Sequence, residues 1–416
     1  MFRTLPLFKT MLFLLAFSLL WSCSKDESSD APTESSEGLS LLNSMDGTSI
    51  GEYSDSDSTG GSSTSDGGDN GGQTPEAGVI TAGEWKDLDD WEYWLQIMRN
   101  PDWIKMQEYW QFFPTQRYSA IVKNNQNQVL NDAQVLLKDA QGNVIWQAHT
   151  DNSGAVELWA GLYGENREAN HIEVIHNSQN FTFNDIQQID DGKMELKVNS
   201  TISTNNYLDI SVVVDATGSM GDEMEFLKVE LQDVLNRVKS NNANVDLRIG
   251  TTFYRDDSDV YLVRNFPMTS QIGDMLTNIE EQAAGGGGDF PEAVEAGLSA
   301  ALYENNWSES ATARLMFLLL DAPPHHNQEV TGKLQQIVED ATAKGIKIIP
   351  ITASGIGKET EFLMRFFAIS TNGTYVFITN HSGVGGDHIE PTIGQYEVEK
   401  LNDLLVRLIG EYTEMN

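Results

Sequence analysis

Oxygen-bearing side chains follow a mostly apolar stretch in the second half of the chain. The run Leu208–Val214 has the composition of a buried strand and ends at Asp215, and hydroxyl groups follow at Thr217 and Ser219. A helical pattern begins at about Gly221. Carboxylate and hydroxyl oxygens packed into a strand-to-helix turn are the ligands that a hard divalent cation prefers. The spacing therefore predicts a divalent-cation site at this turn.

Two further carboxylates occupy positions where they could complete such a site. Asp321 ends a second apolar run, Leu315–Leu320, and Asp289 follows the glycines at 285–288. In an open parallel sheet, ligands bind at the carboxyl ends of the strands, near the switch in strand order. We therefore expect Asp215 and Asp321 at one edge of a sheet. The glycines would let the loop backbone approach that edge closely and present the Asp289 carboxylate.

Three features together resemble a von Willebrand factor A domain over roughly residues 205–416. They are the turn Asp215-Ala-Thr217-Gly-Ser219, the loop at Asp289 and the strand-ending Asp321. In that family the site is a metal-ion-dependent adhesion site that holds Mg²⁺, Mn²⁺ or sometimes Ca²⁺. The resemblance implies that Thr217 and Ser219 bind the metal through their hydroxyls. It also implies that Asp215 and Asp321 act directly or through bound water.

Two positions differ from the commoner pattern of the resembled family. A serine is more usual where Thr217 stands, but threonine keeps the hydroxyl. The third element is usually a threonine after glycines, whereas this chain has Gly-Gly-Gly-Asp289-Phe-Pro-Glu292, similar to a bacterial branch of the family. We expect Asp289 to reach the metal. As a direct ligand it would bind the cation tightly and weaken its attraction for an acidic partner. Acting through water, it would leave the cation free to take up a partner's carboxylate.

Other polar residues are expected around the site without binding the metal, namely Asp256, Glu292, His325 and His326. The two histidines are adjacent on a proline-bent loop and must point in different directions, which favours the rim over joint metal binding. A glycine-rich loop expected at the same end of the sheet carries His381, Asp387 and His388. The glycines at 285–288 are not a dinucleotide fingerprint, because they follow a helix and not a strand.

The pattern after residue 205 alternates strands with helices, which predicts an α/β fold with a doubly wound, mostly parallel sheet. The predicted strands are 208–214, 245–253, 261–266, 315–320, 346–353 and 374–379. Helices are predicted from about 221 to 239, from 270 to 282, up to 303, from 329 to 344, from 358 to 370, and through Leu408. The short link between 253 and 261 permits a hairpin, so that one pair of strands would be antiparallel.

Two segments precede this domain. Residues 81–116 are rich in tryptophan, tyrosine and phenylalanine and carry helical spacing, so they predict helices. The aromatic side chains could pack on a neighbouring domain or form a platform for a carbohydrate or a partner. Residues 117–200 show short alternating runs separated by polar turns, which predict a small antiparallel β-sandwich. Their rhythm resembles Ig-like or carboxypeptidase-regulatory-like modules.

The amino end reads as an export and anchoring region. Residues 1–22 resemble a bacterial lipoprotein signal peptide, and Cys23, the single cysteine of the chain, would be acylated. The resemblance implies a lipid anchor in the outer membrane. Ser24-Lys25-Asp26-Glu27 resembles the surface-export signal of Bacteroidetes lipoproteins, and a periplasm-facing protein is the alternative. Residues 23–80 are rich in serine, glycine and acidic residues and predict a disordered tether.

The net charge of the chain limits the classes of partner that it can bind. With 62 acidic and 26 basic residues the net charge is −36, which disfavours nucleic acid as a partner. We expect a surface lipoprotein, and not an enzyme, that binds an extracellular protein or glycan through the cation. Two alternatives stay open. One is a structural or assembly component of the envelope with a non-adhesive metal site. The other is a metal-dependent hydrolase with His325, His326 or His388 as base.

Overall fold

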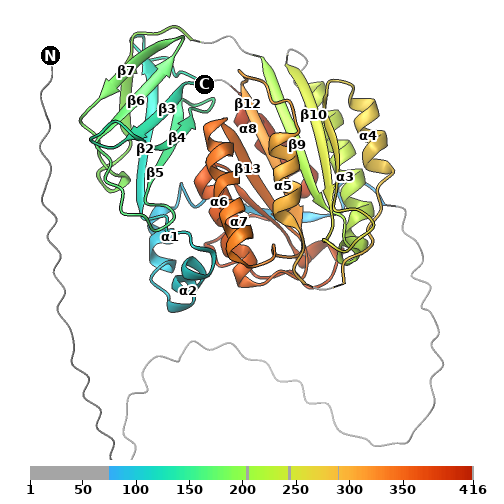
Figure 1. The fold of residues 1–416 in the computed structure, drawn as a ribbon. Coiled ribbons are helices and arrows are strands. Elements are labelled where there is room, and N and C mark those ends of the chain that lie inside the picture. The colour runs from blue at the N-terminus through green and yellow to red at the C-terminus, as the bar shows by residue number, and fades with distance from the viewer. Residues whose placement is uncertain (1–74, 203–205, 242–244, 289, 415–416) are drawn as a thin grey trace, which may run out of the picture. The chain divides into compact units, whose positions relative to one another are not determined.

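A computed structural model describes residues 75–416 except 203–205, 242–244, 289 and 415–416. The predicted signal peptide, Cys23 and nearly all of the predicted tether lie outside the described residues. The described part belongs to one compact unit, Gly71–Asn416. It contains a large α/β region, two aromatic helices and a β-sandwich (Figure 1).

The large sheet has eight strands in the order β11-β10-β9-β12-β13-β14-β1-β15. Its parallel part consists of β9 (Tyr207–Asp215), β10 (Asp246–Tyr254), β12 (Ala313–Leu320), β13 (Ile346–Thr352) and β14 (Tyr375–Ile378). β11 (Val263–Thr269) forms the predicted antiparallel hairpin with β10. β15 (Glu399–Lys400) closes the far edge. The prediction of a doubly wound, mostly parallel sheet is confirmed.

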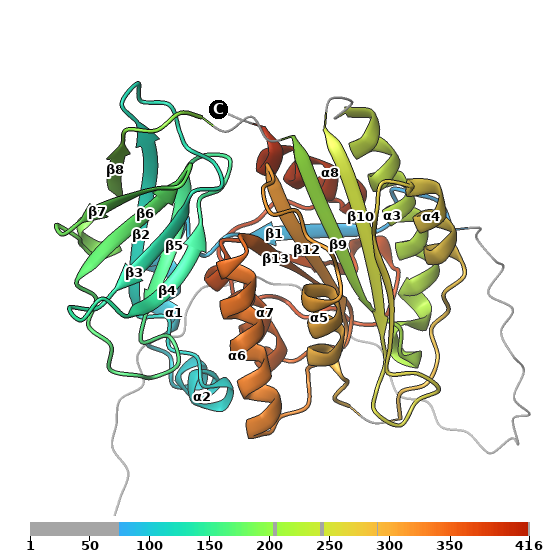
Figure 2. The same cartoon turned by 45° about the horizontal axis from the view of Figure 1, so that its top comes forward.

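Helices cover both faces of this sheet, as strands buried on both sides require. One face packs against α3 (Gly221–Asn241), α4 (Ile272–Glu280) and α8 (Leu401–Thr413). The other packs against α5 (Val294–Tyr303), α6 (Gln328–Ala343) and α7 (Lys358–Thr371). Figures 1 and 2 show both layers. No helix within the described residues is long and apolar enough to cross a membrane.

One strand of the large sheet comes from a segment that we predicted as helical. β1 (Thr81–Trp85) lies between β14 and β15 and is antiparallel to both. The predicted tether also ends earlier than residue 80, because the backbone N–H groups of residues 78–80 donate to the buried Glu230 carboxylate of α3 at 2.8–3.1 Å. A five-residue strand with little alternation carries almost no period-2 signal, so its partners decide its structure.

The aromatic helices α1 (Trp91–Ile97) and α2 (Pro101–Trp110) pack on α7. The rings of Trp94 and Trp103 lie 6.0 and 5.7 Å from that of Phe362, centre to centre. Phe112 stacks on Phe366 at 3.6 Å. Most of the aromatic side chains therefore pack against the neighbouring α/β region, which was the first of the two interpretations. Asn100 caps α2 by accepting from the Asp102 N–H.

The β-sandwich has two sheets, β5-β2-β8 and β4-β3-β6-β7. Its strands are β2 (Gln116–Asn124), β3 (Gln134–Lys138), β4 (Val144–His149), β5 (Ala155–Ala160), β6 (His171–His176), β7 (Gln179–Phe183) and β8 (Met194–Val198). The pairing is antiparallel except between β2 and β8. The sandwich core continues into the layer formed by α5, α6 and α7, so the two regions share one apolar interior.

Candidate metal centre

The candidate site lies where the order of the large sheet reverses. From β9 the chain passes to β10 on one side and later to β12 on the other, and both strands run parallel to β9. The carboxyl ends of β9 and β12 therefore open a crevice between them. Asp215 is the last residue of β9, and Asp321 follows the last residue of β12. The structure thus places these two carboxylates at one edge, as expected.

The turn after β9 gathers three of the predicted oxygen donors. The N–H and hydroxyl of Thr217 both donate to Asp215 Oδ1, at 2.9 and 2.7 Å. Thr217 Oγ1 lies 3.1 Å from Ser219 Oγ. A short 3-10 turn, Gly218–Met220, then leads into α3. Asp215 and Thr217 are fully buried and Ser219 is exposed, so the donors run from the interior to the surface.

The glycine loop lies against this turn. The Gly218 N–H donates to the Gly286 carbonyl at 3.0 Å, and the Gly285 N–H donates to the Ala216 carbonyl at 3.1 Å. Gly286 and Gly287 have φ of +76° and +68°, which favours glycine. A Cβ at Gly287 would also lie 2.9 Å from Glu292 Oε1. The close backbone approach that we predicted is therefore present. Asp289 lies outside the described residues, and its role stays a prediction.

Three carboxyl groups at this edge are held close together without a cationic partner among the described residues, and their pKa values rise. Burial and then Asp321 raise the pKa of Asp215 to about 7, although Thr217 opposes this. Burial raises the pKa of Asp321 to about 6, partly offset by a hydrogen bond from Ser219. Burial and the neighbouring Asp215 raise the pKa of Glu292 to about 8. A divalent cation would relieve this repulsion.

Buried oxygens of these groups are also left without hydrogen bonds among the described residues: Asp215 Oδ2, Asp321 Oδ1 and Glu292 Oε2. Such orphaned acceptors normally have a partner, and an ion is one explanation. No group of three His, Cys, Asp or Glu side chains in the described part of the chain is arranged to hold a metal. The donor set here is instead two carboxylates and two hydroxyls, with Asp289 still to be placed. Oxygen donors of this kind fit Mg²⁺ or Mn²⁺.

The predicted rim residues have different surroundings. His325 Nε2 lies 2.7 Å from Asp256 Oδ1. Burial lowers the pKa of His325, but the interaction with Asp256 opposes this and the pKa is raised overall. Asp256 in turn raises the pKa of Glu292, so this pair lies beside the site. His326 differs from the expectation. Its ring stacks on Tyr109 at 3.5 Å, and its Nε2 donates to the Tyr109 carbonyl, so it attaches α2 to the α/β region.

Sequence reasoning missed Glu223 as a member of this region. A carboxylate in the first turn of α3 would also suit the helix dipole, but the side chain is fully buried and its Oε2 has no partner among the described residues. Its Oε1 accepts from the Ser354 hydroxyl, and it raises the pKa of Asp321. The backbone of Gly385 packs on it, which brings the predicted glycine-rich loop to this edge. The signal available in the sequence was its place four residues after Ser219.

The three polar residues predicted in that loop have contacts of their own. His388 Nδ1 lies 2.9 Å from Asn380 Oδ1, while its Nε2 is buried and has no partner among the described residues. His381 Nδ1 lies 3.3 Å from Thr379 Oγ1. Asp387 accepts through its carbonyl from the Gly355 N–H. These contacts order the loop locally and do not join it to Asp215.

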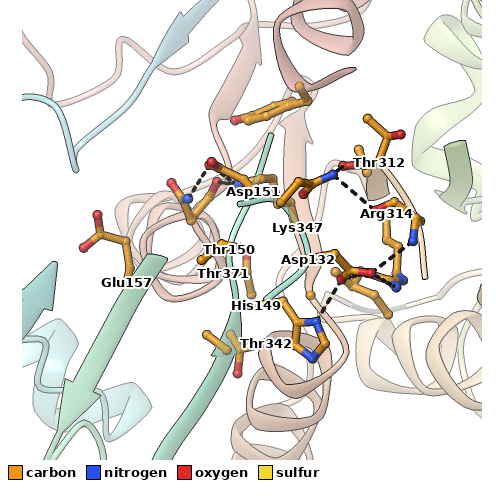
Figure 3. Close-up of a pocket in the computed structure, with 18 of the residues that line it drawn as sticks. Asp132, His149, Thr150, Asp151, Glu157, Thr312, Arg314, Thr342, Lys347 and Thr371 are labelled. Carbon is orange, nitrogen blue, oxygen red and sulfur yellow. Dashed lines mark hydrogen bonds and ion pairs between the residues drawn. The ribbon is translucent and has the colours of Figure 1, made fainter. Parts of the chain in front are cut away.

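A polar cavity at the opposite end of the sheet is not a competing ligand site. It lies between the sandwich and the amino ends of β12 and β13, and its volume of about 30 Å³ has room for little more than one water molecule (Figure 3). Its walls are joined by ion pairs, from Asp132 to Arg314 at 2.9 Å and from Asp151 to Lys347 at 3.2 Å. This cavity belongs to the junction of the two regions.

Comparison with known proteins identifies the region that carries the site. Residues 209–386 match the family model of the von Willebrand factor A domain. Over 121 residues the chain is 34% identical to the ariadne-like RING finger protein R811 of Acanthamoeba polyphaga mimivirus, which covers 29% of this chain and 11% of that protein. Over 141 residues it is 26% identical to the alpha-protein kinase vwkA of Dictyostelium discoideum, which covers 33% of this chain and 22% of that protein. The matches thus span a small part of each relative.

Two solved structures are similar to about half of the chain. One is BatB from Bacteroides thetaiotaomicron, with a TM-score of 0.34 and 13% identity, covering 49% of this chain and 98% of that one. The other is an aerotolerance-related membrane protein from Bacteroides fragilis NCTC 9343, with a TM-score of 0.32 and 12% identity, covering 50% and 98%.

Proposed function

Because residues 209–386 match the family model of the von Willebrand factor A domain, we propose that this chain binds a partner through a divalent cation held between β9 and β12. Domains of this family generally mediate protein interactions, and the proposal assigns this chain a cation-dependent form of that role. The partner is an extracellular protein or glycan that offers a carboxylate. We propose binding, not catalysis, as the function of the site.

One observation carries the proposal. Asp215, Asp321 and Glu292 each keep a buried oxygen without a hydrogen-bond partner among the described residues, at a place where hydroxyl groups also converge. Such an arrangement is costly in a protein that never binds a cation, because each buried carboxylate is desolvated and repels its neighbours. A divalent cation would supply the missing charge and the missing contacts together.

The residues divide the work of holding a cation. Thr217 and Ser219 would bind it through their hydroxyls, and Asp215 and Asp321 would neutralise it from the buried side. When bound, the cation would supply an open coordination position, to which an oxygen atom of a partner's carboxylate could bind. Ser219 is exposed, whereas Asp215 is fully buried, so the open side of the donor set faces solvent. Glu292 and the Asp256–His325 pair add charge beside it.

The amino-terminal half would carry this domain at the cell surface. In the proposal, Cys23 is acylated and anchors the protein in the outer membrane, and the acidic segment after it spaces the domain from the bilayer. The large negative charge of the chain, −36, would repel an anionic membrane surface and help to extend the segment. A periplasm-facing orientation is the alternative.

Calorimetric titration of Mg²⁺ and Mn²⁺ into the full-length protein tests the cation site. Full length is required because β1 and the aromatic helices, which precede residue 205, are built into the large sheet and its helical layer. We expect saturable binding, and we expect Thr217→Val to abolish it while leaving the fold intact, because valine keeps the shape of threonine and removes the hydroxyl. Thr182→Val, on exposed β7, is the matched control and should bind like the parent.

The outcome decides between the proposals. Binding that is lost in Thr217→Val and kept in Thr182→Val would support a cation-dependent binding domain. Absence of binding by the parent protein would contradict it and favour a structural or assembly component of the envelope.

A further inference from the structure

A second acidic feature lies beside the candidate metal centre and shares none of its proposed ligands. It is a groove of about 610 Å³ between α5, the start of α6 and the loop that follows β10. The carboxylates that line it come from all three elements: Asp257, Glu295, Glu304 and Glu329. Lys333 is the cation that lines it, and its Nζ lies 2.8 Å from Glu329 Oε1.

Glu295 is the most deeply buried carboxylate of this groove. The residue is 9% exposed, and its Oε2 is buried without a hydrogen-bond partner among the described residues. Burial raises the pKa of Glu295, although Lys333 and His325 oppose this. An unpaired carboxylate in such a position is costly unless a cation reaches it. Glu295 thus lines the groove and keeps an acceptor that nothing described in the chain satisfies.

The shape and lining of the groove suit an elongated cation. Leu262 and Tyr303 line it and are 38% and 49% exposed, so they offer apolar surface to a hydrocarbon stem. Lysine and arginine combine such a stem with a charged end.

We propose that this groove binds a lysine or arginine side chain of a protein partner, with Glu295 pairing with its charge. The stem of the basic side chain lies along Leu262 and Tyr303, while Asp257 and Glu304 add attraction at the mouth. The site goes beyond the proposed cation function, because it needs no metal. His325 lies near both sites, since it bonds to Asp256 and acts electrostatically on Glu295.

Methyl NMR on the full-length protein tests this proposal, with the protein in EDTA so that the result is independent of the cation site. The probes are N-acetyl-arginine amide and N-acetyl-lysine amide. We expect saturable shifts of the Ala296, Ala300 and Leu262 methyl signals, which line the groove. Glu295→Gln should weaken binding about tenfold or more, because it removes a charge-assisted pair and keeps the shape. Lys333→Gln should tighten it several-fold by removing the competing cation.

Three controls make the outcome decisive. Glu92→Gln, at an exposed position on α1, should bind like the parent. N-acetyl-citrulline amide, an uncharged analogue of the arginine probe, should bind at least tenfold more weakly. An unchanged melting temperature would show that Glu295→Gln is folded. Equal affinity for the citrulline probe, or no effect of Glu295→Gln, would overturn the proposal. Tighter binding of spermidine than of the arginine probe would overturn the assignment to a protein side chain.

Discussion

At the scale of single residues, Asp215 combines two properties that rarely coexist in a purely structural carboxylate. Its Oδ1 accepts two hydrogen bonds from Thr217, whereas its buried Oδ2 has no partner among the described residues. One oxygen therefore orders the turn, and the other is left for a further partner. The first property explains the local structure, and the second is the one that a cation would use.

Substitution of Asp215 by asparagine separates these two properties. Asparagine keeps an acceptor for Thr217 and removes the charge that burial and Asp321 disfavour. We expect Asp215→Asn in EDTA at pH 8 to melt at or above the temperature of the parent. Mg²⁺ at 100 times its dissociation constant should stabilise the parent by about 2.7 kcal/mol and leave the variant unchanged.

Thermal unfolding with and without Mg²⁺ measures this difference. The exposed Asp246, at the start of β10, provides the matched control Asp246→Asn, which should respond to Mg²⁺ like the parent. A variant at Asp215 that melts well below the parent in EDTA would show that the carboxylate is structural.

At the scale of elements, the strand before the aromatic helices is fixed from two sides. β1 pairs with β14, and the residues just before it donate three backbone N–H groups to the buried carboxylate of Glu230 on α3. A carboxylate that accepts several N–H groups forms strong, charge-assisted bonds. The contact defines where the predicted tether must end, and it attaches the amino-terminal segment directly to the α/β region.

Loss of the contact between Glu230 and the backbone of residues 78–80 should destabilise the protein. Glu230→Ala leaves the N–H groups of residues 78–80 without their acceptor, and we expect the free energy of unfolding to fall by about 2–4 kcal/mol. Urea denaturation followed by circular dichroism measures the change. Glu225→Ala, on the exposed side of α3, should change it by less than about 1 kcal/mol, because Glu225 makes a surface ion pair with Lys228. Equal effects of the two variants would contradict a stabilising role of the Glu230 contact.

At the scale of the whole molecule, the sandwich is joined to the amino-terminal ends of the parallel strands, opposite the candidate metal centre. The Asp132 carboxylate accepts hydrogen bonds from Nη1 and Nη2 of Arg314, at 2.9 and 3.1 Å (Figure 3). It also contacts His149. Asn152 donates to the carbonyls of Glu411 and Glu414 at the end of α8. The sandwich is therefore held against the α/β region by polar bonds and by a shared apolar interior, so it does more than space the domains.

This junction should weaken in acid. Burial opposes ionisation of Asp132, but hydrogen bonds from His149 and Arg314 outweigh it and lower its pKa from 3.8 to about 2. A carboxyl with a lowered pKa stabilises the fold above its unfolded pKa, and this contribution is lost as the pH falls through the folded pKa. We expect the stability difference between the parent and Asp132→Asn to shrink by about 2 kcal/mol between pH 6 and pH 2.

Urea denaturation of both proteins across this pH range measures the effect. Asp185→Asn, at an exposed position of the sandwich, should show no such dependence. A difference between parent and Asp132→Asn that stays constant with pH would contradict the prediction.

The sequence by itself determined the elements that carry the candidate site. Buried parallel strands read as continuous apolar runs, so 208–214 and 315–320 were recognisable, and their carboxylates had to meet at one edge once the sheet was parallel. The glycines at 285–288 likewise predicted that the loop backbone approaches the turn after β9 closely, as Gly286 and Gly287 do. These features depend on local periodicity and on general rules of topology.

Tertiary structure alone decided the features that depend on distant partners. β1 is a strand because β14 and β15 border it, His326 attaches α2 because Tyr109 lies opposite, and Glu223 faces the site because loop 380–388 buries it. The unpaired oxygen of Glu295 is equally invisible in the sequence, where that residue is one more charge on a helix. Burial and partners arise from contacts between residues far apart in the chain, and no local pattern encodes them.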